Sequence, residues 1–120
     1  MTNTQAQNEV RARVHGMWAR VADAWGANAD DVDRRGAEIT ARMLGAIDVR
    51  AGDRVLELAC GPGGAGLAAA ELVGPEGDVM LSDVVVGMVD IAAQRAAARG
   101  LTNVHAEVLD LEDIAQPDEA

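Results

Sequence analysis

The first fifty residues place apolar side chains at helical spacing. Over residues 5–25 one apolar stripe recurs every three or four positions, made of Val10, Val14, Met17, Trp18, Val21 and Trp25. Gly26 and Asn28 interrupt this stripe, and Asn28 or Asp30 is suited to cap a second helix. The second stripe consists of Val32, Ile39, Met43, Leu44 and Ile47. We therefore expect two amphipathic helices before residue 50.

After residue 50 the pattern changes to short apolar runs separated by turns. Runs typical of strands occupy residues 54–59, 78–83 and 104–109. Between them, small and apolar residues predict helices over about 65–73 and 87–99, with Gly100 as a plausible C-cap. Strands and helices thus alternate, which predicts an α/β fold with a parallel sheet and right-handed crossovers.

Composition narrows the class of protein. A chain of 120 residues suits one domain, and 49% hydrophobic with 25% charged residues is an ordinary globular balance. The formal net charge of −10 argues against a nucleic-acid partner, because acidic chains gain nothing from counterion release. The sequence shows no signal peptide and no membrane-spanning stretch, so we expect a cytoplasmic protein without a membrane partner.

A glycine-rich segment follows the first predicted strand. Residues 61–66 read GPGGAG, which matches the GxGxxG fingerprint of dinucleotide-binding folds. Asp83 lies about twenty residues further on, where that fingerprint places an acid for the ribose. An NAD- or FAD-binding domain of an oxidoreductase is therefore one interpretation of this segment.

Glu57 favours a different ligand. It lies inside the apolar strand four positions before Gly61, and a carboxylate there is costly to bury unless it is paired. It would repel a pyrophosphate but attract a cation. The alternative is a strand-end carboxylate whose hydrogen bonds come from backbone or water.

Three segments together resemble class I S-adenosylmethionine-dependent methyltransferases. Residues 55–63, VLELACGPG, resemble motif I, in which an acid precedes a spaced glycine run. Residues 83–88, DVVVGM, resemble the start of the second strand–helix unit, and residues 103–110, NVHAEVLD, resemble the third strand. The leading helices are similar to the lid of the ubiquinone/menaquinone-biosynthesis-like branch. The resemblance implies a Rossmann-like fold, with a helical lid at 1–50 and a cofactor-binding half at 51–120.

The resemblance assigns residues to the methionine end of S-adenosylmethionine. Glu57, where the family more often has Asp, would meet the ammonium group. Ala59 stands where the first glycine of the motif is usual, and it would lie near the methionine part. Gly61 and Gly63 would let the backbone approach the cofactor closely, because glycine lacks a Cβ.

Other residues are assigned to the nucleoside end in the same way. Asp83 would accept hydrogen bonds from the ribose hydroxyls, and Val84 would pack on the adenine. Asp110 would accept from the adenine amino group, while the Leu111 N–H would donate to the ring. Met88 is also a candidate contact, although methionine at such a position is more often part of the core.

The remaining candidates for chemistry are weak. His15 is interpreted as a surface or lid histidine and His105 as a plain strand residue. Cys60 is interpreted as a small loop residue without nucleophilic function, and the two histidines and one cysteine are too dispersed for a metal site. No catalytic residue is predicted.

The family's sheet has seven strands, of which this sequence supplies three. We expect a chain truncated after the third strand, before the part that would bind a methyl acceptor. The expected acceptor is a small molecule. Two alternatives are a genuine short chain that needs a partner and a non-catalytic nucleoside-binding relative. The missing fourth strand would leave the first strand as an edge, so the isolated chain is expected to self-associate, which light scattering would test.

Overall fold

The computed structural model describes residues 2–114. A long helix, α1 (Asn3–Ala46), precedes β1 (Arg54–Glu57), α2 (Gly64–Val73), β2 (Asp78–Asp83), α3 (Val86–Ala98) and β3 (Val104–Val108). The predicted alternation of strands and helices is confirmed, with ends that differ from the expected ones by one or two residues.

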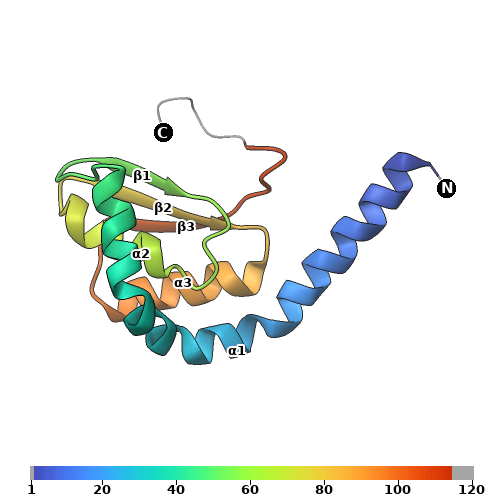
Figure 1. Ribbon diagram of the computed structural model, residues 1–120, viewed down its shortest axis with the longest axis horizontal. Coiled ribbons are helices and arrows are strands. Elements are labelled where there is room, and N and C mark those ends of the chain that lie inside the picture. The colour runs from blue at the N-terminus through green and yellow to red at the C-terminus, as the bar shows by residue number, and fades with distance from the viewer. Residues whose placement is uncertain (1, 115–120) are drawn as a thin grey trace.

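The three strands form one parallel sheet in the order β1-β2-β3. Figure 1 shows α2 and α3 on the same side of this sheet, as expected when two right-handed crossovers advance in one direction. Alternate residues of β2 face these helices, and Val79 and Leu81 are fully buried against Leu67 and Val73 of α2. This packing places the carboxyl ends of all three strands at one end of the sheet.

Within the described residues, β1 pairs only with β2, so its other side is a sheet edge. An edge strand presents N–H and C=O groups to other strands. Self-association through this edge stays a prediction.

The prediction of two helices before residue 50 was wrong, because α1 is continuous through Gly26 and Asn28. Glycine inside a helix costs about 1 kcal/mol, but here it permits close packing. A Cβ on Gly26 would lie 2.8 Å from Cδ1 of Ile91 in α3. The Asn28 side chain donates to the Ala24 carbonyl (2.8 Å) within the helix instead of capping a new one.

Two parts of α1 have different surroundings. Its second half packs on α2 and α3, where Leu44 joins the core, whereas its first half extends from the body of the molecule (Figure 1). The first apolar stripe remains substantially exposed, with Val10 at 54% and Trp18 at 42%. No helix within residues 2–114 is long and apolar enough to cross a membrane.

Candidate functional site

The loop between β1 and α2 has an unusual backbone. Ala59, Gly61 and Gly63 all have left-handed φ angles, of 52°, 56° and 90°. Glycine adopts this conformation freely, whereas alanine in it costs about 1–2 kcal/mol of conformational free energy. Glycine would therefore suit position 59 better than the alanine that occupies it. Gly63 also packs tightly, because a Cβ there would lie 3.1 Å from Leu81 Cδ1. The loop is thereby pressed onto β2, while a Cβ on Gly61 would meet nothing within 4 Å.

Glu57 ends β1 on the side of the sheet that α2 covers. Its Oε1 accepts a hydrogen bond from the Gly66 N–H at 3.1 Å. Burial raises the pKa of Glu57 to about 7, and the neighbouring Asp33 and Asp83 carboxylates add to this, while the Gly66 bond opposes it. The backbone partner expected under the alternative interpretation is therefore present, and a cation would still be favoured beside this carboxyl group.

The raised pKa of Glu57 predicts a specific dependence of stability on pH. The ordinary pKa is 4.5 and the folded one about 7, so between these values the folded state holds the proton more tightly. The free energy of unfolding of the wild type, relative to Glu57→Gln, should fall as pH rises through this window. Above about pH 7 the difference should level off, because the carboxyl group is then ionised in both states.

Urea unfolding of both proteins at about pH 5 and about pH 8 checks this expectation. Glutamine keeps an oxygen for the Gly66 N–H and stays neutral, so the other titrating groups are common to both proteins. Identical pH profiles for the two proteins would contradict a raised pKa at Glu57.

Asp83 ends β2 and is 9% exposed. One carboxylate oxygen accepts from the Gly61 N–H and the other from the Val85 N–H, both at 2.9 Å. The side chain therefore ties the glycine loop to the start of α3. A carboxylate has about four acceptor positions, so two remain for hydroxyl donors from a ligand.

A groove of about 1140 Å³ lies between the first half of α1 and the ends of β2 and β3. Val84, Asp110 and Leu111 line its strand side, and apolar α1 residues such as Val14 and Trp18 line the other. Val84 is 42% exposed and Leu111 is 54% exposed. The Asp110 side chain accepts from the Glu112 N–H at 2.9 Å, which fixes its orientation at the groove.

These residues fit a cationic nucleoside better than a dinucleotide. Glu57 and Asp83 are acids beside the glycine loop, where a pyrophosphate would be repelled. Exposed apolar side chains at Val84 and Leu111 offer a surface for a purine ring. Open space over Gly61 leaves room for a ligand near the backbone. Carboxylate acceptors, apolar side chains and open backbone are together consistent with an ammonium group, a ribose and an adenine.

The other candidates lie elsewhere or have structural contacts. Met88 is 4% exposed and packs with Ala22 and Val85 between α1 and α3. Burial raises the pKa of the Cys60 thiol to about 12, so it is protonated at neutral pH. His105 pairs with Asp78 at 2.8 Å at the opposite end of β2. The described residues contain no cluster of three or more potential metal ligands.

Sequence reasoning missed two features of the site. One is the contact of α1 with the strand ends, beyond the lid that the resemblance implied: His15 Nε2 lies 3.3 Å from the Val84 carbonyl oxygen. The other is Arg95 of α3, which donates to the Pro62 carbonyl in the glycine loop at 2.7 Å. Neither lies in a recognisable motif, because both contacts join segments that are far apart in the sequence.

Comparisons with known proteins identify the family of this chain. Residues 50–120, more than half of the chain, match the family model described as methyltransferase domain. Aklanonic acid methyltransferase DauC of Streptomyces sp. (strain C5) is 34% identical over 97 residues, covering 78% of this chain and 44% of the relative. The ubiquinone/menaquinone biosynthesis C-methyltransferase UbiE of Stenotrophomonas maltophilia is 45% identical over 53 residues, covering 44% and 21%.

A solved structure gives the same result. A SAM-dependent methyltransferase from Aquifex aeolicus superimposes with a TM-score of 0.61 and 28% identity, covering 66% of this chain and 42% of that one. The chain spans less than half the length of these relatives. Strand order, glycine loop and sequence similarity agree, and the chain belongs to the methyltransferase domain family, with the fold of the class I S-adenosylmethionine-dependent methyltransferases.

Proposed function

We propose that this chain supplies the S-adenosylmethionine-binding part of an enzyme that transfers a methyl group to a small-molecule acceptor. The observation that carries the proposal is the placement of three acids at the carboxyl edge of the sheet: Glu57 ends β1, Asp83 ends β2 and Asp110 follows β3. The names of two relatives support a small-molecule acceptor, since they refer to aklanonic acid and to ubiquinone/menaquinone biosynthesis.

At the methionine end, Glu57 attracts the ammonium group, and the loop residues Ala59, Gly61 and Gly63 form the floor. The proposal is supported by the raised pKa of Glu57, because burial and, to a lesser extent, the acidic neighbours make the ionised carboxylate costly, and a ligand cation would offset that cost. It is also supported by the open space over Gly61.

At the nucleoside end, Asp83 accepts from the ribose hydroxyls while it holds the loop through Gly61. Val84 and Leu111 pack on the adenine, and Asp110 accepts from its amino group. Val84, Asp110 and Leu111 line one groove, which supports these three roles. Met88 packs with Val85 in the core, so we propose a supporting role behind Val84 for it.

The first half of α1 covers the cofactor as a lid, in keeping with a lid at residues 1–50 and a cofactor-binding half at 51–120. Bound S-adenosylmethionine supplies an activated methyl group. The protein's contribution is to hold donor and acceptor in line, and such alignment is worth about 7–11 kcal/mol. The apolar α1 residues lining the groove favour an apolar acceptor over a nucleic acid.

Titration calorimetry with S-adenosylmethionine, S-adenosylhomocysteine, NAD and FAD tests the proposal. We expect the first two ligands to bind and the dinucleotides not to, because a pyrophosphate would lie beside Glu57 and Asp83. Tighter binding of NAD or FAD than of S-adenosylhomocysteine would overturn the proposal in favour of an oxidoreductase domain.

A further inference from the structure

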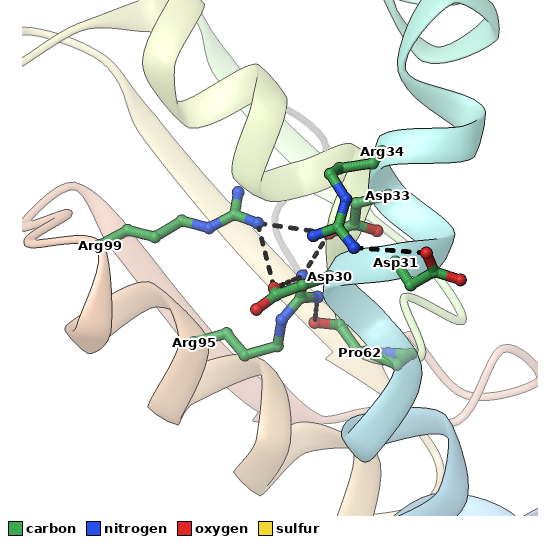
Figure 2. Close-up of polar contacts among 7 residues, drawn as sticks. All are labelled: Asp30, Asp31, Asp33, Arg34, Pro62, Arg95 and Arg99. Carbon is green, nitrogen blue, oxygen red and sulfur yellow. Dashed lines mark hydrogen bonds and ion pairs between the residues drawn. The ribbon is translucent and has the colours of Figure 1, made fainter.

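Arg95 joins three segments that lie far apart in the sequence. Its side chain is 12% exposed, and Nη1 donates to the Pro62 carbonyl of the glycine loop at 2.7 Å. Nη2 donates to Asp30 Oδ1 at 3.0 Å and also to the carboxylate of Asp33. Figure 2 shows the guanidinium of α3 between the two α1 aspartates and the loop carbonyl. One cation thus connects α3, α1 and the glycine loop.

The loop is therefore held from two directions. Asp83 accepts from the Gly61 N–H at 2.9 Å, and Arg95 donates to the carbonyl of the next residue, Pro62. Glycines at 61 and 63 make the loop backbone permissive, so its shape depends on such restraints. An anion thus holds the N–H of Gly61, and a cation holds the carbonyl of the residue that follows it.

Asp33 brings α1 into direct contact with the same loop. A Cβ on Gly64 would lie 2.2 Å from Asp33 Oδ1, so the carboxylate lies against the first residue of α2. The Asp33 side chain is 27% exposed, and a partly buried carboxylate needs a partner. The guanidinium of Arg95 provides that partner through Nη2 and contacts the loop carbonyl through Nη1.

We propose that Arg95 is a positioning residue that couples the seating of α1 on the body of the protein to the shape of the glycine loop. When α1 is seated, Asp30 and Asp33 hold the guanidinium where it reaches Pro62. The loop is then shaped before the cofactor arrives. The effect on cofactor affinity rests on the proposed function, whereas the effect on the loop does not.

Amide hydrogen exchange without ligand tests the loop directly. The Gly61 N–H bonds to Asp83 and the Gly63 N–H to the Cys60 carbonyl at 3.0 Å, so both report on loop opening. In Arg95→Met these two amides should exchange about tenfold faster or more than in the wild type. The Val79 N–H, bonded to the Asn103 carbonyl across the sheet at 2.8 Å, reports unfolding and should change less.

Arg99→Met is the matched control. Arg99 lies one turn further along, past the end of α3, and approaches Asp33 at 3.3 Å and Asp30 at 3.9 Å. Among the contacts of the described residues it reaches these aspartates and not the loop carbonyl. In Arg99→Met, the exchange rates of the Gly61 and Gly63 amides should stay within about threefold of the wild-type rates. Equal acceleration of the loop in Arg95→Met and Arg99→Met would overturn the proposal.

Two further variants keep the test decisive. If Arg95→Met does not fold, Arg95→Lys is compared with Arg99→Lys. Only Arg95→Lys should speed up exchange of the loop amides, because the lysine ammonium cannot reach the aspartates and the loop carbonyl at once as the planar guanidinium does. Asp33→Asn should also speed up exchange of the Gly61 and Gly63 amides, and unchanged exchange rates in that variant would refute the coupling to α1.

S-adenosylhomocysteine should bind about tenfold more weakly to Arg95→Met than to the wild type. Absent binding to the wild type would refute the proposed function, while exchange would still decide the role of Arg95.

Discussion

Replacing Asp83 by Ala is expected to weaken S-adenosylhomocysteine binding by about 10-fold to 1,000-fold, equivalent to about 1.5–4 kcal/mol. The carboxylate is 9% exposed and, in the proposed complex, accepts charged hydrogen bonds from the ribose. The same substitution also removes the acceptor for the Gly61 N–H, so the loop loses a restraint on the cofactor side. Both effects lower affinity, and titration calorimetry measures their sum.

Two controls separate the site from general effects. Asp90→Ala removes an exposed carboxylate of the same charge from α3 and should leave binding within about threefold. His15→Ala removes the α1 side chain near the Val84 carbonyl and should affect cofactor binding far less than Asp83→Ala. Circular dichroism establishes that each variant is folded. A folded Asp83→Ala protein with normal affinity would show that the ribose site is misplaced.

Gly66→Ala is expected to lower the free energy of unfolding by about 1–3 kcal/mol. The new Cβ would lie 2.0 Å from Leu81 Cδ2 and 2.8 Å from Glu57 Oε1. Leu81 is fully buried, so its side chain has no open space into which to rotate. The strain falls where α2 meets both β1 and β2, and it also disturbs the hydrogen bond from the Gly66 N–H to Glu57.

Gly36→Ala is the matched control for this substitution. Gly36 lies inside α1, and a Cβ there would meet nothing within 4 Å. Alanine should therefore raise the free energy of unfolding by about 0.5–1 kcal/mol through helix propensity alone. Urea unfolding of both variants measures the two effects. Equal stability changes would mean that α2 does not approach β2 as closely as the structure indicates.

The sequence alone predicted the order of the elements from residue 54 onward. Apolar runs, glycine turns and helical stretches are local patterns. Their alternation along the chain favours a parallel sheet over most other arrangements of strands and helices. It also placed Glu57 inside the first strand, Asp83 at the end of the second and Asp110 just after the third. The carboxyl ends of parallel strands lie at one edge of the sheet, so these acids were expected near one another. The family resemblance rested on these same residues.

How α1 and the glycine loop contact one another and the sheet became visible in the folded protein and not in the sequence. Gly26 looked like a helix break from its local propensity, but packing against Ile91 makes a small residue there compatible with a continuous helix. Arg95 had no local signal at all, since its partners Asp33 and Pro62 are 62 and 33 positions away. Local propensity is a weak term that packing and ion pairing between distant segments override, and such contacts leave no spacing pattern in a single sequence.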